Sequence, residues 1–356
     1  MRILHAADLH LDAPLTGLPE EATVRLRREM RTLPGKIVDI CRKYRCDLLL
    51  LSGDVFDGQS TRKTVLALHQ ALKDVAIPVF IAPGNHDFCT PDSPWMTENW
   101  PDNVYIFKRP VVESVTVPGL NCRIYGAGFT SMDCPGLLEG FAAEGEERCH
   151  IGVFHGDAVQ KNSPYNPVTQ SQVAASALDY LALGHIHKSG SFTAGETLCA
   201  WPGCPMGHGY DETGEKGVLL VEIADGATAA FLPLDVPRFY DLEAPVRTTA
   251  EAAVAAALPG GGRDDFYRIT LTGESEEIDL SVLSRQFAHY PNLQLRDKTR
   301  PVADLWAAVG EDSLEGECFR RLRSAMEGQD EEGRRIALLA ARICRTILDG
   351  GEVELP

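Results

Sequence analysis

Side chains that can bind metal ions follow five short apolar runs of this sequence. They are carboxylates, imidazoles and one amide, and each lies at or just after the end of its run. The set is Asp8, His10, Asp54, Asn85, His155, His185 and His187. Because the carboxyl ends of strands in an open α/β sheet form the ligand-binding edge, we expect these side chains to converge.

The spacing and the chemistry of this set indicate two metal ions. Asp8/His10 and His185/His187 are spaced i,i+2, so in an extended chain each pair would project to one side. Oxygen and nitrogen ligands without thiolate suit Mn²⁺ or Fe²⁺, and also Zn²⁺. Seven ligands suit two ions, and only a carboxylate can bridge ions roughly 3.5–4 Å apart. We predict two divalent ions bridged by Asp54, Mn²⁺ first, with Fe²⁺, Mg²⁺ or Zn²⁺ also possible.

The turn Asn85-His86-Asp87 predicts a division of roles. If Asn85 turns toward metal, His86 points elsewhere, over a bound phosphate, where it could protonate the leaving oxygen. We predict His86 as the catalytic residue. Asp57 and Asp87 are predicted to orient an imidazole or a ligand, and a role as ordinary loop carboxylates stays open for both.

The remaining histidines are assigned mainly to structural roles. No other candidate ligand lies beside them in sequence, or they fall on an apolar helix face. His208, in "PMGHGYDETGEKG", is predicted either to line the cleft or to belong to a hairpin loop. Those assigned to structure are His5, His69, His150 and His289.

Composition and charge limit the classes of function. The chain has 356 residues, ten cysteines and a net charge of −17. That acidity argues against a protein that coats nucleic acid by general electrostatic attraction. Scattered thiols without C-x-x-C pairs predict reduced cysteines in a cytoplasmic protein and exclude a zinc ribbon. Neither a secretory signal nor a membrane-spanning run is found, so we expect no membrane association.

The catalytic part of the chain reads as an α/β domain over residues 1–235. Apolar runs alternate with helical patterns through roughly the first 190 residues, and "CDLLLLSGD" is typical of a strand buried on both faces. Helical spacing is clear at 35–44 and 60–76. Strands and hairpins follow over 191–235, with Asp225-Gly226 a good two-residue turn.

Two smaller parts are predicted after this domain. Residues 236–300 read as a small α+β unit with a break at 259–262, and residues 301–356 read as helical. The last helix carries an apolar stripe that either packs within its own domain or docks a partner. The stripe is Ile336, Leu339, Ala340, Ile343 and Ile347.

Five ordered motifs carry a resemblance to a known family. "DLH", "GDVFD", "GNHD", "HGD" and "GHIH" occur in this order, and the sequence resembles the calcineurin-like metallophosphoesterases over about residues 1–235. The resemblance implies a double-sheet sandwich flanked by helices. It also implies that one ion takes Asp8, His10, Asp54 and His187, and that the other takes Asp54, Asn85, His155 and His185.

Within that superfamily the sequence looks most like the SbcD-type DNA-repair nucleases, particularly the YhaO-like branch. "LHAADLHLDAP" and "GDVFD" are the stretches most similar to it. Gly58 and Gln59 follow Asp57, where phosphoprotein phosphatases of the superfamily carry an arginine. The resemblance implies a DNA-facing capping domain at 236–300, docking of a coiled-coil SMC-like ATPase at 301–356, and a homodimer as one option.

These observations predict a two-metal phosphodiesterase acting on DNA. The leading hypothesis is a Mn²⁺-dependent DNA-repair exonuclease, with single-strand endonuclease action as an additional activity. The same dinuclear core could instead serve a phosphodiesterase or phosphatase for small molecules or phosphoproteins. Two further hypotheses are a nuclease that is dormant without its ATPase and a non-enzymatic scaffold with a degenerate site.

Overall fold

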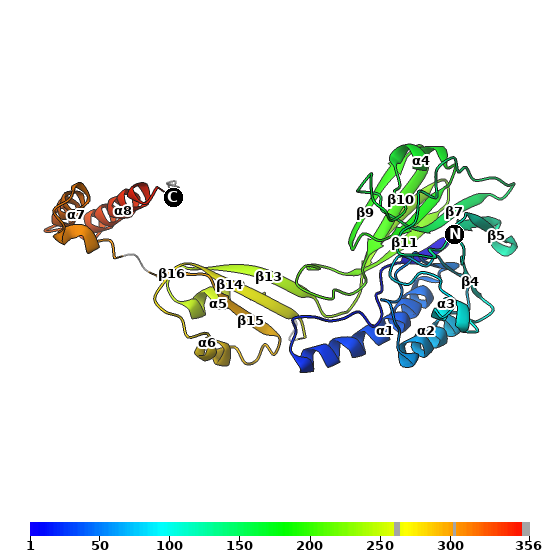
Figure 1. The fold of residues 1–356 in the computed structure, drawn as a ribbon, viewed down its shortest axis with the longest axis horizontal. Helices are drawn as coiled ribbons and strands as arrows, with labels where there is room; N and C mark the ends of the chain where they lie inside the picture. The colour runs from blue at the N-terminus through cyan, green and yellow to red at the C-terminus, as the bar shows by residue number, and fades with distance from the viewer. Residues whose placement is uncertain (260–263, 302–303, 351–356) are drawn as a thin grey trace. The chain divides into compact units, whose positions relative to one another are not determined.

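The computed structural model describes residues 1–259, 264–301 and 304–350 (Figure 1). The chain forms two compact units. The first contains Met1–Leu242, Pro259–Arg268 and Phe287–Gln294, and the second contains Glu243–Leu258, Ile269–Gln286 and Leu295–Pro356. The domain boundaries predicted at 235 and 300 stay predictions, and the predicted break at 259–262 lies, after Pro259, outside the described residues. Within the described ranges, every helix is too short or too polar to cross a membrane.

One six-stranded mixed sheet of the first unit contains the N-terminal strand. Its strands are, in spatial order, β12 (Ala227–Pro233), β11 (Gly217–Ile223), β1 (Arg2–Ala6), β2 (Leu48–Leu51), β3 (Val79–Ile81) and β4 (Val104–Ile106). Strands β1 to β4 are parallel, whereas β11 and β12 pair antiparallel. The predicted turn at Asp225-Gly226 joins β11 to β12 and is confirmed.

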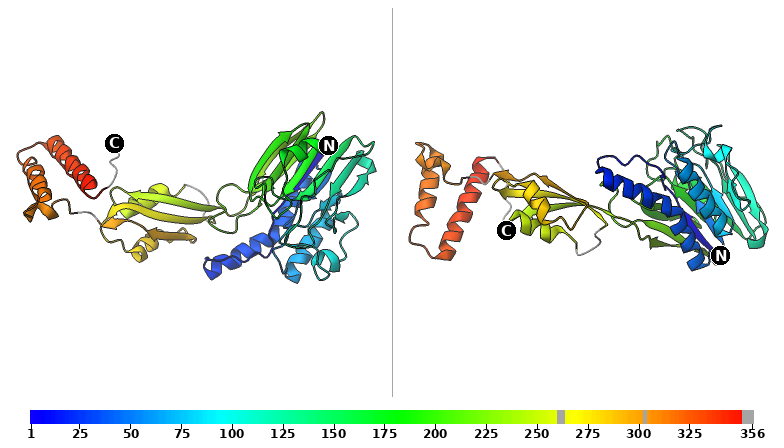
Figure 2. Two further views of the ribbon diagram at one scale, coloured as in Figure 1. Left: turned by 45° about the horizontal axis from the view of Figure 1, so that its top comes forward. Right: turned by 90° about the horizontal axis from the view of Figure 1, so that it is seen from below.

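A second six-stranded sheet packs against the first. Its strands are, in spatial order, β5 (Glu113–Val117), β6 (Cys122–Gly126), β7 (Cys149–His155), β8 (Tyr180–Gly184), β10 (Thr197–Gly203) and β9 (Lys188–Ala194). The four inner strands are parallel, and each edge strand pairs antiparallel. Figure 2 gives two further views of these sheets.

Strand β2 explains how one strand serves two cores. Alternate residues of a strand face opposite sides of the sheet. Leu48 and Leu50 join the cluster between the two sheets, with Ile124 and Ile151 of the second sheet. Leu49 and Leu51 join a different cluster, which lies under the helices. The predicted α/β double-sheet fold flanked by helices is therefore confirmed.

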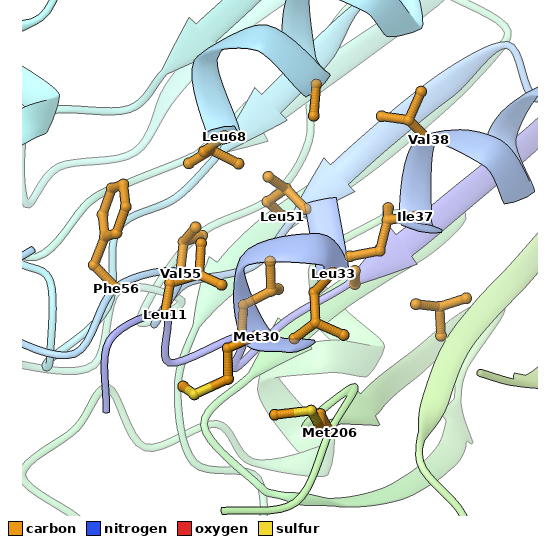
Figure 3. Close-up of a cluster of buried hydrophobic side chains, with 14 of the residues drawn as sticks. Leu11, Met30, Leu33, Ile37, Val38, Leu51, Val55, Phe56, Leu68 and Met206 are labelled. Atoms are coloured by element: carbon orange, nitrogen blue, oxygen red, sulfur yellow. The ribbon is translucent and has the colours of Figure 1, made fainter. Parts of the chain in front are cut away.

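Helices cover the outer face of the first sheet. Those of the first unit are α1 (Glu20–Tyr44), α2 (Arg62–Val75), α3 (Pro94–Thr97) and α4 (Gln170–Ala175). Met30, Leu33 and Ile37 of α1 pack beside Leu51 and Leu11 (Figure 3). The α1 helix begins fifteen residues before the predicted 35–44 segment and continues through Pro34, because burial of one continuous apolar face outweighs one missing hydrogen bond.

The rest of the chain forms a small sheet and four helices. The strands are β13 (Phe239–Val246), β14 (Phe266–Ser275), β15 (Leu293–Asp297) and β16 (Arg300–Pro301). The helices are α5 (Ala250–Ala257), α6 (Leu280–Gln286), α7 (Leu314–Ser324) and α8 (Glu331–Leu348). Phe319 of α7 and Ala341 of α8 form a small core. Of the predicted stripe on α8, Ile336, Leu339 and Ile347 are exposed in this chain.

Candidate metal centre

The seven predicted ligand side chains lie at the carboxyl ends of β1, β2, β3, β7 and β8, where the strand ends were expected to converge. The reason for their convergence differs from the one predicted. Asp8, His10, Asp54 and His185 have φ angles of 52°, 43°, 49° and 94°, so neither i,i+2 pair lies in extended backbone. Positive φ is uncommon for residues other than glycine and clusters at functional sites.

Asp8, His10 and His187 form one group whose ligand atoms lie within 4.8 Å of one another. The two imidazoles face each other, with Nε2 of His10 3.0 Å from Nε2 of His187. Asp8 is fully buried, and its Oδ1 accepts the backbone N–H of His185 at 2.8 Å. Its Oδ2 has no hydrogen-bond partner among the described residues, and burial raises the pKa of Asp8. An unpartnered buried carboxylate oxygen beside two imidazole nitrogens fits a divalent cation.

Asp54, His155 and His185 form a second such group, and Asn85 completes it. Nδ1 of His155 lies 3.0 Å from the carbonyl oxygen of Ser52, which can only accept, so Nδ1 carries the proton. Nε2 of the neutral ring then directs a lone pair at Oδ1 of Asn85, 2.9 Å away, and at Oδ2 of Asp54, 3.2 Å away.

Three acceptors that face one another repel unless a cation lies between them. Burial alone would lower the pKa of His155, but the charges of Asp54 and Asp8 outweigh it and raise this pKa to about 9. The imidazole therefore gains a proton when no other cation is offered. This arrangement fits a metal ion held by two nitrogens and two oxygens.

Asp54 lies between the two groups. Its Oδ2 is 3.8 Å from Nε2 of His10 and 3.2 Å from Nε2 of His155, while Oδ1 accepts the backbone N–H of His86 at 2.9 Å. Burial would raise the pKa of Asp54, but these histidines lower it below its usual range. Asp54 thus stays charged and has the position expected of a bridging carboxylate.

Two glycines allow these side chains to approach so closely. A Cβ added to Gly84 would lie 2.3 Å from Oδ1 of Asp54 and 2.8 Å from the His155 ring. At Gly53, where φ is +89°, an added Cβ would lie 2.2 Å from Nδ1 of His155. Neither position has room for a side chain, because the space is occupied by the candidate ligands.

His86 lies at the exposed rim of the centre. Its side chain is 43% exposed, and its ring lies 4.8 Å from the ring of His10. Nδ1 of His86 is 2.5 Å from Oδ1 of Asp57, which is also 3.8 Å from Nδ1 of His10. The hydrogen bond from Asp57 raises the pKa of His86. Asp57 therefore lies where an orienting carboxylate was predicted.

Asp87 contacts backbone rather than an imidazole. Its carboxylate accepts N–H groups from Gly84 at 2.7 Å, Val55 at 2.9 Å and Phe56 at 3.2 Å. Burial, followed by the charge of Asp54, raises the pKa of Asp87 to about 6. Asp87 thus holds together the two loops that carry Asp54 and Asn85.

Glu212 was not identified from the sequence. Its Oε1 accepts a hydrogen bond from Nδ1 of His187, and its Oε2 accepts both the backbone N–H of His208, at 2.7 Å, and the His208 ring, at 2.8 Å. These hydrogen bonds outweigh burial and lower the pKa of Glu212. A carboxylate on the far nitrogen of a metal-binding histidine fixes the tautomer that leaves Nε2 free.

The other histidines separate as predicted, with one resolution. His5 is fully buried between Tyr180 and Ser52, with ring-to-hydroxyl distances of 2.7 and 2.6 Å. Burial lowers its pKa to about 3, so it is a neutral core residue. His208 lines the centre, because its ring lies 5.6 Å from that of His10.

Comparison with known proteins identifies the family. The calcineurin-like phosphoesterase family matches residues 1–189, more than half of the chain. The chain belongs to the calcineurin-like phosphoesterases. The resemblance inferred from the five motifs is therefore confirmed, and the protein is a phosphoesterase-type hydrolase with two candidate groups of metal ligands.

Three curated relatives are similar to this phosphoesterase. An uncharacterized metallophosphoesterase, YhaO of Bacillus subtilis, is 33% identical over 64% of this chain and 58% of its own length. The DNA double-strand break repair protein Mre11 of Saccharolobus solfataricus is 26% identical over 63% and 61%, respectively. A component of the nuclease SbcCD of Bacillus subtilis is 25% identical over 65% and 68%. The chain spans about six tenths of the length of the first two relatives.

Proposed function

We propose that this phosphoesterase is a two-metal phosphodiesterase that cleaves DNA as a repair exonuclease, with an SMC-like coiled-coil ATPase as its partner. The observation that carries the proposal is the set of acceptors around Nε2 of His155, which fits a cation and not a hydrogen-bond network. DNA as the substrate is supported by the relatives named as a component of a nuclease and as a double-strand break repair protein.

The two candidate groups would hold one ion each. Asp8, His10 and His187 would hold the first, Asn85, His155 and His185 would hold the second, and Asp54 would bridge them. When bound, two divalent ions supply positive charge for a phosphate and make a water molecule more acidic. Mn²⁺ is the proposed metal, because the ligands are nitrogen and oxygen without thiolate.

The chain's own residues would then handle the leaving group. Asp57 accepts from Nδ1 of His86, so Nε2 is the atom that can donate a proton outward. The raised pKa of His86 favours the protonated form near neutral pH. His86 would therefore protonate the leaving oxygen, and Asp57 would keep its ring in place.

The partner proposal rests on the C-terminal segment 301–356. On α8, Ile336, Leu339 and Ile347 are exposed, whereas the residues buried against α7 include Ala341. An exposed apolar stripe on a helix is suited to packing against helices of another protein. The region 236–300 is proposed to face DNA.

The decisive experiment is a digestion panel. Labelled duplex DNA, single-stranded DNA, RNA, a mononucleotide ester and a phosphopeptide are each incubated with Mn²⁺, Mg²⁺ or Zn²⁺, using Asp54→Asn as the inactive control. The proposal expects Mn²⁺-dependent loss of terminal nucleotides from DNA, abolished in the control. Faster turnover of the ester or the phosphopeptide would favour a small-molecule or phosphoprotein substrate instead. Adding the ATPase distinguishes a dormant nuclease, and purified protein that takes up no metal would favour the scaffold.

A further inference from the structure

A pocket of about 420 Å³ opens beside His86, on the far side of that residue from the buried ligands. Its volume falls within the range of small-ligand sites, roughly 300–1,000 Å³. All its lining residues come from two loops and a short helix of the first unit. They are Phe56, Gly58, Gln59, Ser60, His86, Asp87, Phe88, Thr90, Asp92, Ser93 and Pro94.

The walls of this pocket combine an aromatic surface with hydroxyl groups. Phe56 is buried and Phe88 is half-buried, so their rings give the pocket an apolar side. The hydroxyl oxygens of Ser60 and Ser93 are buried and have no hydrogen-bond partner within the described part of the chain. Unpartnered buried hydroxyls beside a pocket indicate a ligand that carries hydrogen-bonding groups.

The charge of the pocket excludes a phosphate as the occupant. The Thr90 hydroxyl donates to Asp92 at 2.6 Å, and this hydrogen bond lowers the pKa of Asp92. Asp92 is therefore ionised at neutral pH, and a second anion in the same pocket would be repelled. A flat, uncharged group with polar edges fits both the aromatic wall and the hydroxyls.

We infer that this pocket binds the nucleobase of the nucleotide whose oxygen leaves, with Phe88 as its stacking surface. The inference rests on the proposed function, in which His86 protonates that leaving oxygen. Because His86 forms part of the pocket wall, the nucleoside attached to the leaving oxygen is the part of the substrate nearest to it. Base stacking on an aromatic side chain tolerates every base, so the pocket would raise the rate on nucleic acid without reading its sequence.

The test uses dinucleotides that lack one base. Full-length protein with Mn²⁺ is given d(ApA) and its two derivatives in which either adenine is replaced by hydrogen, and the products identify which nucleoside leaves. In the wild type, loss of the leaving-side base should lower kcat/KM about tenfold, the usual size of one stacking contact. Phe88→Ala should show the same loss on d(ApA) and no further loss on the derivative that lacks the leaving-side base.

Two further variants and a binding measurement separate stacking from misfolding. Phe88→Trp should keep the preference for a base, and Met96→Ala, an exposed residue of α3 outside the pocket, should behave as wild type. In EDTA, where no turnover occurs, a dinucleotide with 2-aminopurine on the leaving side should lose fluorescence on binding to wild type but not to Phe88→Ala.

The outcomes distinguish the two proposals. If wild type hydrolyses all three dinucleotides equally and Phe88→Ala matches it, the pocket does not bind a base, although the phosphodiesterase proposal stands. If wild type hydrolyses neither the dinucleotides nor bis(p-nitrophenyl) phosphate with any of the three metals, both proposals are overturned.

Discussion

Replacing Glu212 with glutamine tests whether this carboxylate prepares His187 for metal binding. Glu212 accepts three hydrogen bonds on two oxygens, one from His187 and two from His208. Glutamine has one acceptor oxygen and one NH₂ group. If the oxygen serves His208, the NH₂ group faces Nδ1 of His187, which must then give up its proton to Nε2. A protonated Nε2 cannot bind a metal ion.

The size of the effect follows from this tautomer exchange. Removing a partner that orients a metal-binding histidine weakens metal affinity about 10–100-fold, which is about 1.4–2.7 kcal/mol. Only the group of Asp8, His10 and His187 contains the affected ring. We therefore expect one of two Mn²⁺ binding steps to weaken by this factor in Glu212→Gln, while the other stays within about threefold of wild type.

Isothermal titration of the metal-free protein with Mn²⁺ measures both steps. Glu215→Gln is the matched control, because Glu215 is on the same loop and its exposed side chain pairs with Arg238 at 3.5 Å. Thermal unfolding in EDTA checks that both variants fold. Two unchanged binding steps in Glu212→Gln would refute the orienting role, and equal weakening of both steps would show a general disturbance of the centre instead.

Three other changes have defined outcomes. His86→Ala should keep both Mn²⁺ binding steps but lower kcat about 10²–10⁴-fold, and Asp57→Asn should move the alkaline limb of kcat to lower pH, because Asp57 raises the pKa of a residue that must be protonated; loss of metal in His86→Ala would contradict this assignment. His5 has a folded pKa of about 3, below its unfolded value near 6.5, so the unfolded state binds more protons between these values, and the free energy of unfolding should fall by about 1.4 kcal/mol for each pH unit below 6.5. Urea unfolding in EDTA at pH 7, 6 and 5 measures this, and His5→Asn should lose that share of the slope. Gly84→Ala places a Cβ 2.3 Å from Asp54 and should lower the free energy of unfolding by about 1–3 kcal/mol, a loss that calorimetry of the metal-free protein would detect and that an unchanged melting temperature would rule out.

The strand ends could be predicted from the sequence because burial and chemistry alternate so sharply there. In "LLLLSGD" an apolar run gives way to Asp54 within three residues, and such a transition marks the edge of a sheet. The backbone angles could not be predicted in this way. Asp8 and His10 converge through positive φ values, which are fixed by tertiary contacts and leave no local pattern in a non-glycine residue.

Glu212 and the first half of α1 were missed for different physical reasons. Glu212 lies in a loop between β10 and β11, where a carboxylate has no periodicity that would distinguish it from its acidic neighbours. Pro34 and Gly35 read as a helix boundary from local propensity. In the structure the apolar face on both sides of Pro34 packs on the first sheet, so a non-local contact decides the outcome.

The four leucines of β2 have a consequence for how the chain chooses its strand pairing. Shifting β2 by one residue would leave leucine at three of its four positions, so hydrophobicity alone hardly discriminates between neighbouring alignments. Ser52, whose hydroxyl contacts His5, and Gly53, which has no room for a methyl group, can occupy their places in one alignment only. The same short segment that delivers Asp54 to the cations therefore also stops β2 from sliding, and damage to it would mispair the sheet before it harmed any reaction.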